Sequence, residues 1–346
     1  MTNNKIFLLI LFVASVLSAS AQHWYADSLG NGYQMRFVDL GKDYQGDARC
    51  TLIRLAPESP ASHRGVLYIH GYNDYFFQTE LGEEFARHGY RFYALDLRRY
   101  GRSLRPGDKP FTIRNFTDYF QDVDSALQAM RSAGCDTIVM MAHSTGGLLA
   151  AYYQAEHPDS PVDLLVLNSP FLDWNLGKLE CFINAASFFG MIFPDMKVST
   201  GGGGVYAEAL EKKHHGEWTY NESKKSTDYG VTLAWVRAVN QAQHKLRKLK
   251  GDIRIPILLM YSAASSNPKH WTEEASETDV VLDVKDIRKY GMSLGPDVTP
   301  IAVKGGMHDL ILSKPSVRYP LYDYIFKWLD RELDNNDRTI HVAPSL

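Results

Sequence analysis

The stretch Thr137-Ile-Val-Met-Met-Ala-His-Ser-Thr-Gly-Gly-Leu148 decides the fold of this 346-residue chain. Its first half is an apolar run typical of a buried strand, and its second half begins a helical pattern that continues to His157. Ser144 lies in the turn between them, two residues after Ala142 and two before Gly146. Small residues at these positions let strand and helix approach closely and expose a serine on a sharp turn. The pattern predicts a nucleophile at Ser144.

Strand and helix patterns alternate on both sides of this stretch. We expect strands at 33–40, 49–55, 65–69, 90–97, 137–142, 162–168, 255–262 and 298–303, and helices at 78–88, 115–133, 146–157, 232–248 and 316–333. Such alternation predicts an α/β fold, with a mainly parallel twisted sheet and helices on both faces. Ligands of such sheets bind beyond the carboxyl ends of the strands.

The N-terminus has the pattern of an export signal. Lys5 precedes the apolar run from Ile6 to Leu17, and Ala19-Ser20-Ala21 supplies the small residues that precede a cleavage site. Residues 1–21 are therefore predicted to be a signal peptide, and the protein to be periplasmic or secreted. A helix of about twelve apolar residues is about 18 Å long, too short for a stable span of a hydrocarbon core of roughly 30 Å.

Residues 22–333 are expected to form a single domain, followed by a loose polar tail at 334–346. An insertion at about 172–250 separates two expected strands and is predicted to cap the carboxyl edge of the sheet. Its aromatic residues either line an acyl pocket or pack on the sheet, and the sequence leaves both open. They are Phe182, Phe188, Phe189, Phe193 and Trp235.

Composition narrows the classes of partner. The formal net charge of −3 gives no electrostatic argument for binding nucleic acid. The three cysteines, Cys50, Cys135 and Cys181, cannot all pair within one chain and are expected to be buried thiols. The pair His214-His215 has no further ligands at suitable spacing, so no metal site is predicted.

A serine hydroxyl is a weak nucleophile and needs a base and an oxyanion hole. The stretch Val303-Lys-Gly-Gly-Met-His-Asp309 follows the last expected strand and offers His308 as the general base. The strand at 65–69 ends in His70-Gly71-Tyr72-Asn73. We expect the backbone N–H groups of Tyr72 and Thr145 to form the oxyanion hole, with His70 supporting the loop.

Together these motifs resemble the monoacylglycerol lipase and serine aminopeptidase branch of the α/β-hydrolases. The similarity lies in His70-Gly71, in Asp96-Leu-Arg-Arg-Tyr-Gly-Arg-Ser103, in the turn at Ser144 and in Gly306-Met-His308. It covers most of residues 48–333. The resemblance implies the order serine, acid, histidine along the chain, and a catalytic triad.

The acid is the one member of the triad that departs from the family pattern. The resemblance implies a carboxylate three residues after Ser262, but Ser265 stands there. The family pattern of Asp followed by hydrophobic residues reappears only at Asp279. We therefore assign Asp279 to orient His308. Asp283 is the alternative acid, and Asp173, after an earlier strand, is a third candidate.

These residues predict an exported serine hydrolase that cleaves carboxylic esters, of the carboxylesterase or lysophospholipase type, through an acyl-enzyme. The expected substrate is a small-molecule or lipid-like ester, and no cofactor is required. A serine exopeptidase (aminopeptidase) of the same fold is an alternative. It would need a carboxylate for the substrate ammonium, and Glu180, Glu208 and Glu211 are available. A non-catalytic binding protein is a further alternative, which the presence of both Ser144 and His308 disfavours.

Overall fold

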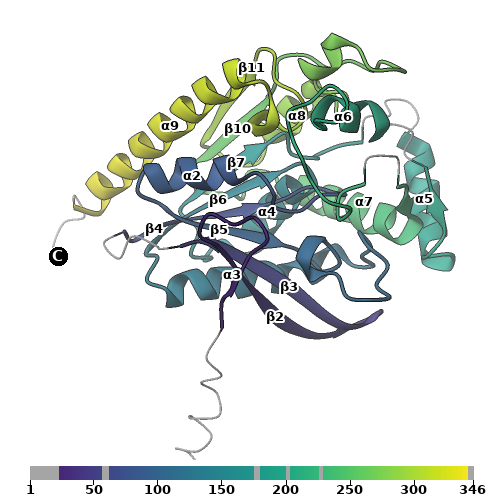
Figure 1. Cartoon of the computed structure of the whole chain (residues 1–346), viewed down its shortest axis with the longest axis horizontal. Coiled ribbons are helices and arrows are strands. Elements are labelled where there is room, and N and C mark those ends of the chain that lie inside the picture. Colours follow the sequence, from purple (N-terminus) through teal and green to yellow (C-terminus); the bar gives the residue numbers. More distant parts are fainter. Residues whose placement is uncertain (1–22, 57–61, 175–179, 200–202, 226–228, 342–346) are drawn as a thin grey trace, which may run out of the picture.

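The computed structural model describes residues 23–56, 62–174, 180–199, 203–225 and 229–341 (Figure 1). The signal peptide predicted at 1–21 lies outside these residues. The strands are β1 Tyr25–Ala26, β2 Tyr33–Asp43, β3 Gly46–Leu55, β4 Arg64–Ile69, β5 Arg91–Asp96, β6 Thr137–His143, β7 Leu164–Asn168, β8 Lys197–Val198, β9 Val231–Thr232, β10 Ile257–Ser262 and β11 Val298–Val303. The helices are α2 Thr79–Arg87, α3 Phe120–Ser132, α4 Thr145–Glu156, α5 Glu180–Ile192, α6 Gly203–Leu210, α7 Leu233–Lys248, α8 Val284–Gly291 and α9 Pro315–His341. Short 3₁₀ turns lie at η1 Gly101–Ser103, η2 Phe116–Tyr119, η4 Glu273–Ser276 and η5 Leu310–Leu312.

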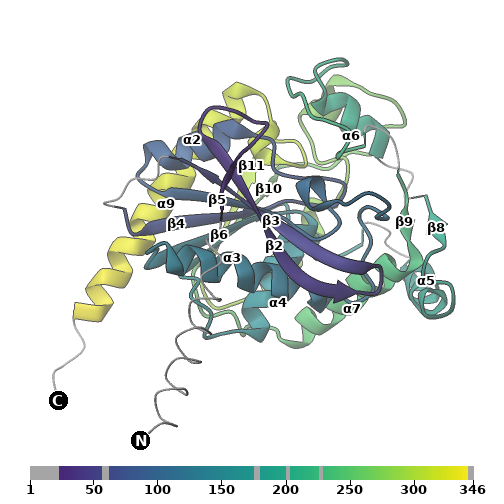
Figure 2. The same cartoon turned by 60° about the horizontal axis from the view of Figure 1, so that its bottom comes forward.

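A nine-stranded sheet has the order β1-β2-β3-β5-β4-β6-β7-β10-β11. The strands from β5 to β11 in this order run parallel, and β1, β2 and β3 add an antiparallel edge. Figure 2 shows β2 and β3 as a long hairpin beside the parallel strands. The predicted α/β fold with a mainly parallel sheet is confirmed.

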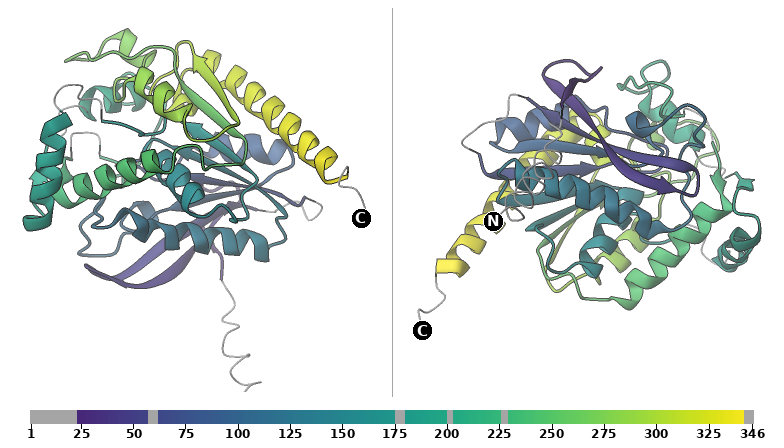
Figure 3. Two further views of the ribbon diagram at one scale, coloured as in Figure 1. Left: turned by 180° about the vertical axis from the view of Figure 1, so that it is seen from behind. Right: turned by 90° about the horizontal axis from the view of Figure 1, so that it is seen from below.

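Apolar strands and amphipathic helices explain the layers. Every residue of β7 and β10 is buried, as expected for parallel strands covered on both faces. Residues of α2 and α9 pack into the core on one face of the sheet, and residues of α3, α4, α7 and α8 pack into the core on the other. The views from behind and below show the same division (Figure 3).

The chain changes direction across the sheet at β4. It passes from β4 to β5 on one side and then to β6 on the other side of β4. In the parallel pairing of β4 with β6, Ile69 lies opposite Ala142. The residues that follow these two strands therefore leave the sheet side by side, at the position where open α/β sheets bind their ligands.

The segment between β7 and β10 contains α5, α6, α7 and the small β8–β9 sheet. Its helix α7 packs against α4, and Trp235 and Val239 are buried in the core. That part of the predicted insertion thus belongs to the helical layer over the sheet. Within the described ranges, no helix combines the length and the apolar character needed to cross a membrane.

The C-terminal helix is longer than expected. It continues to His341, so the loose tail predicted from residue 334 is wrong for the residues up to His341, and 342–346 lie outside the described part. Because no glycine or proline occurs between 334 and 341, nothing in the local sequence ends the helix earlier.

Candidate active site

The turn between β6 and α4 holds Ser144 in a backbone conformation that non-glycine residues rarely adopt. Its φ is 52° and its ψ −115°, and such conformations cost on the order of 1–3 kcal/mol unless the surroundings fix them. The Ser144 N–H donates to the carbonyl of Asn168 (3.0 Å), and its carbonyl accepts from Leu148 (3.1 Å) and Phe171 (2.9 Å). These hydrogen bonds hold the turn at the end of β6.

Glycines allow a close backbone approach around this turn. A Cβ at Gly146 would lie 2.3 Å from the carbonyl oxygen of His70 and 2.8 Å from that of Ile69. Only glycine therefore lets the first turn of α4 pack against the end of β4. A Cβ at Gly71 would lie 3.1 Å from the Cβ of Ser144, so the loop after β4 passes directly beside the serine.

His308 joins Ser144 to Asp279. Its Nε2 lies 3.0 Å from Ser144 Oγ, and its Nδ1 lies 2.9 Å from Asp279 Oδ2. His308 is 3% exposed and Asp279 is 0% exposed. Three residues from distant parts of the chain, each expected from the sequence, thus form a continuous line of hydrogen bonds.

After Ser265 the chain leaves the end of β10, and it returns there at Asp279. The Asp279 N–H donates to the carbonyl of Ala264 (2.9 Å), and the Asp279 carbonyl accepts from Ser266 (3.1 Å). These bonds form a bridge between Ser265 and Asp279. Asp279 therefore lies beside the position where the family pattern implies the acid.

The second carboxylate oxygen of Asp279 is also satisfied. Oδ1 accepts from the N–H groups of Val281 and Leu282, both at 2.8 Å. The two rival carboxylates have other partners. Asp283 caps α8 by accepting from Lys285 N–H at 2.9 Å, and Asp173 forms an ion pair with Arg247.

The two amides expected to form an oxyanion hole both adjoin Ser144. Thr145 is the first residue of α4, where backbone N–H groups are unsatisfied and attract negative charge. Tyr72 follows Gly71 in the loop beside the serine. His70 supports this loop, since its Nδ1 donates to Gly71 O (2.7 Å) and its Nε2 accepts from Leu97 N–H (3.1 Å). Burial lowers the pKa of His70, which is neutral in this arrangement.

A layer of buried polar residues lies next to Ser144, His308 and Asp279 and was not expected from the sequence. Asn168 Nδ2 donates to Asp309 Oδ1 at 2.6 Å, and Asn168 Oδ1 accepts from Leu310 N–H at 3.2 Å. Asp309 is 0% exposed. Burial, and after it the charge of Asp74, raise the pKa of Asp309 to about 7. The available signal was a polar residue at the end of an apolar strand, Asn168, and a carboxylate next to His308.

His143 links this layer to His308. Its ring lies 4.8 Å from the His308 ring between centroids, and its Nδ1 lies 3.2 Å from the carbonyl of Asn168. Burial lowers the pKa of His143 well below its ordinary value, and the neighbouring His308 adds to this effect. His143 is therefore a neutral packing partner of His308.

Among the residues that the structure describes, one group of buried side chains is close enough together to hold a metal ion. Ligand atoms of Asp74, His143 and Asp309 lie within 4.8 Å of one another. However, the ammonium of Lys224 lies 2.7 Å from Asp74 Oδ1 and is itself buried. Lys224 therefore supplies the positive charge that a cation would otherwise bring.

A family model described as serine aminopeptidase, S33, matches residues 60–315. The match includes Ser144, Asp279 and His308. The chain belongs to this family.

The S33-family chain is similar to several proteins named as hydrolases. It is 25% identical over 283 residues to a protein named probable lysophospholipase L2 from Haemophilus influenzae, covering 76% of this chain and 82% of that one. It is 28% identical over 223 residues to AB hydrolase superfamily protein YisY from Bacillus subtilis, covering 60% and 77%. The crystal structure of a soluble variant of monoglyceride lipase from Saccharomyces cerevisiae has a TM-score of 0.66 at 16% identity, covering 90% and 98%. The chain is therefore a hydrolase of the serine aminopeptidase S33 family, with the α/β-hydrolase fold.

The aromatic residues of the insertion divide into two groups in this S33-family structure. Trp235 is buried, and its ring lies 4.6 Å from that of Tyr72. The four phenylalanines on and after α5 are 47–65% exposed, so they do not pack on the sheet. They are Phe182, Phe188, Phe189 and Phe193.

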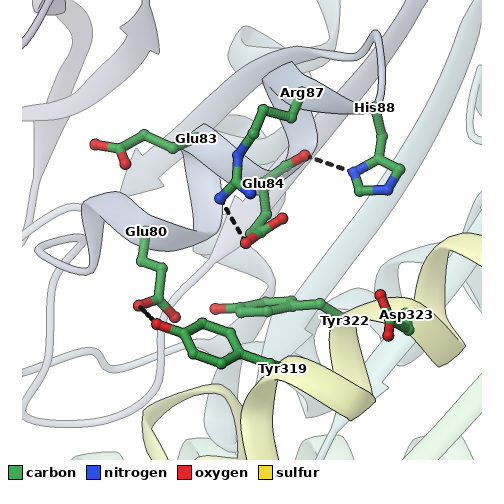
Figure 4. A pocket seen from close by; sticks show the side chains of 8 residues that line it. All are labelled: Glu80, Glu83, Glu84, Arg87, His88, Tyr319, Tyr322 and Asp323. Carbon is green, nitrogen blue, oxygen red and sulfur yellow. Dashed lines mark hydrogen bonds and ion pairs between the residues drawn. The ribbon is translucent and has the colours of Figure 1, made fainter. Parts of the chain in front are cut away.

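A cavity of about 550 Å³ lies between α2 and α9 (Figure 4). Within it, Glu80 accepts from the Tyr319 hydroxyl (3.3 Å), and Glu84 pairs with Arg87. Its lining residues are Glu80, Glu83, Glu84, Arg87, His88, Tyr319, Tyr322 and Asp323. Because none of them contacts Ser144 or His308, this cavity is separate from the candidate active site of the S33-family protein.

Proposed function

We propose that the protein is an exported serine hydrolase that cleaves carboxylic esters of lipid-like molecules through an acyl-enzyme. The observation that carries the proposal is the line of hydrogen bonds from Asp279 through His308 to Ser144, at 2.9 and 3.0 Å. The pattern of residues 1–21 supports export.

Acylation begins with His308. Its Nε2 takes the proton of Ser144 as Oγ attacks the ester carbonyl carbon, and a tetrahedral intermediate forms. The backbone N–H groups of Tyr72 and Thr145 stabilise the oxyanion. His308 then gives the proton to the leaving alcohol as the carbon–oxygen bond breaks. Asp279 accepts a hydrogen bond from the Nδ1–H group throughout and stabilises the imidazolium without taking its proton.

Deacylation reverses these roles with water in place of the alcohol. His308 takes a proton from water, whose oxygen attacks the acyl carbon, and then returns the proton to Ser144 Oγ as the acid is released. His308 is 3% exposed, and this burial strengthens its electrostatic interaction with Asp279.

The relatives support a lipid-like ester as substrate. One is named a probable lysophospholipase, and one structural neighbour is a monoglyceride lipase. The helix α5 carries no charged residue between Cys181 and Ile192, which suits contact with acyl chains.

An aminopeptidase is the second candidate function, and the description of the matching family favours it. It requires a carboxylate that can bind the substrate ammonium. Glu211 is paired with Lys213 at 2.7 Å, which leaves it poorly suited to that role. Glu208 is half-buried on α6, and the side chain of Glu180 lies outside the described part.

A substrate panel separates the two candidates. The mature protein is assayed with p-nitrophenyl esters of increasing acyl length, a monoacylglycerol, a lysophospholipid and aminoacyl anilides, in parallel with Ser144→Ala. We expect ester turnover that Ser144→Ala abolishes, and kcat/KM for anilides far below that for esters. Preferred cleavage of anilides would replace the esterase proposal with the aminopeptidase.

A further inference from the structure

The loop after β4 is bonded to the insertion at four consecutive residues. The Tyr72 hydroxyl donates to Gly230 O (2.5 Å), and the Tyr75 hydroxyl accepts from Asn221 N–H (3.0 Å). Between them, Asn73 and Asp74 bond to Lys225 and Lys224, as described below. We call residues 72–75 the oxyanion loop and residues 221–225 with 229–230 the clamp segment. The clamp segment connects α6 to β9 and crosses the carboxyl edge of the sheet (Figure 1).

Asn73 makes a two-way contact with the clamp segment. Its Nδ2 donates to Lys225 O at 3.0 Å, and its Oδ1 accepts from Lys225 N–H at 2.7 Å. The φ of Asn73 is +50°, a conformation that asparagine tolerates but that must be fixed by its surroundings. The clamp segment therefore fixes the backbone of the residue next to Tyr72, whose N–H is the proposed oxyanion donor.

Lys224 extends from the clamp segment to the floor of the active site. Its Nζ lies 2.7 Å from Asp74 Oδ1, with the two side chains 8% and 3% exposed. Asp74 in turn has a carboxylate oxygen within 4.8 Å of His143 and Asp309 ligand atoms. These residues adjoin Ser144 and His308 in the chain, so a charge from the insertion balances buried carboxylates directly behind the reacting groups.

We propose that Asn73 and Lys224 are positioning residues through which the clamp segment sets the Tyr72 amide and the floor below Ser144 and His308. The inference rests on the proposed function. In this proposal the oxyanion loop and the clamp segment act as one unit. A displacement of the insertion therefore changes the rate of the catalytic step itself, as well as access to the site.

Two variants and one matched control test this proposal in the full mature protein. Lys224→Met removes the buried ammonium, and Asn73→Gly removes both side-chain bonds at a φ that glycine adopts freely. Lys225→Met is the control, because Lys225 contacts Asn73 only through its backbone. With a short p-nitrophenyl ester, we expect kcat to fall at least about tenfold in Lys224→Met and Asn73→Gly, with KM within about twofold. Lys225→Met should match the wild type.

A further variant distinguishes positioning from a loss of folding. Removing Lys224 alone leaves Asp74 buried without a counter-charge, which destabilises the fold. The double variant Lys224→Met/Asp74→Asn has neither charge, so its melting temperature should recover relative to Lys224→Met while kcat remains low. If Lys224→Met does not fold, the kcat of Asn73→Gly decides the question.

The proposal is overturned if folded Asn73→Gly and the double variant both retain wild-type kcat. It is also overturned if, in the double variant, kcat recovers together with the melting temperature. Failure of the proposed function looks different, because the wild-type protein itself then lacks ester turnover. An active wild type with unaffected variants would refute only the positioning role.

Discussion

Asp279→Asn should remove almost all turnover while the protein stays folded. Oδ1 of Asp279 accepts hydrogen bonds from the backbone N–H groups of Val281 and Leu282. An asparagine at this position must direct its oxygen to those donors, so its Nδ2 takes the place of Oδ2 and faces His308 Nδ1. Because that amide donates, Nδ1 must accept, and the imidazole proton moves to Nε2. His308 then cannot accept the proton of Ser144.

The expected loss follows from this change of tautomer. Replacing a triad carboxylate by an amide lowers kcat by about 10⁴-fold, or about 5.5 kcal/mol of activation free energy. Steady-state turnover of a short p-nitrophenyl ester measures the loss, with circular dichroism to check the fold. The control is Asp283→Asn, which should keep full activity because asparagine also caps helices well. A fully folded Asp279→Asn with more than about a tenth of wild-type kcat, or an equal loss in Asp283→Asn, would refute the assignment.

Other predictions concern packing and pH. Gly146→Ala would place a Cβ 2.3 Å from His70 O, so urea denaturation should show a loss of about 1–3 kcal/mol in the free energy of unfolding; an unchanged midpoint would contradict the close approach. Burial and Asp74 raise the pKa of Asp309 to about 7 against the opposing effects of Asn168, His308 and Lys224. The folded protein therefore keeps a proton that the unfolded chain releases near pH 4, and stability falls as pH rises from about 4 to about 7. Asp309→Asn removes this dependence. The free energy of unfolding of the variant minus that of the wild type should therefore be about 2 kcal/mol larger at pH 8.5 than at pH 5.5. Equal differences at both pH values would show that Asp309 does not titrate between them. Phe188→Ser on the exposed face of α5 should change the free energy of unfolding by less than about 0.5 kcal/mol, and a larger loss by urea denaturation would mean that this side chain is buried.

Local patterns were sufficient to predict the parallel sheet and the residues that end its strands. The strand β11 has the predicted limits, Val298–Val303. The helix expected at 115–133 also begins at its expected limit, since the Asn115 side chain caps η2 by accepting from Thr117 N–H. These features depend on apolar runs and on the chemistry of single residues, which neighbouring sequence determines. The same reasoning pointed to Ser144, which directly follows β6, and to His308, which lies in the loop after β11.

The features that the sequence did not indicate depend on contacts between distant segments. Lys224 and Asp74 are 150 residues apart, and nothing near either residue indicates that they meet. Asn168 and Asp309 are 141 residues apart and are likewise joined only by the fold. The helix α8 was missed because it is short, eight residues, and a short run offers few repeats of the helical period.

Labelling with a fluorophosphonate probe tests most directly whether His308 activates Ser144. The probe forms a covalent bond to a serine oxygen only where a base and an oxyanion hole activate it. Mass spectrometry of the digested protein should find the adduct on Ser144, and folded Ser144→Ala should take up none. A folded wild-type protein that stays unlabelled, or an adduct on another residue that persists in Ser144→Ala, would contradict the account.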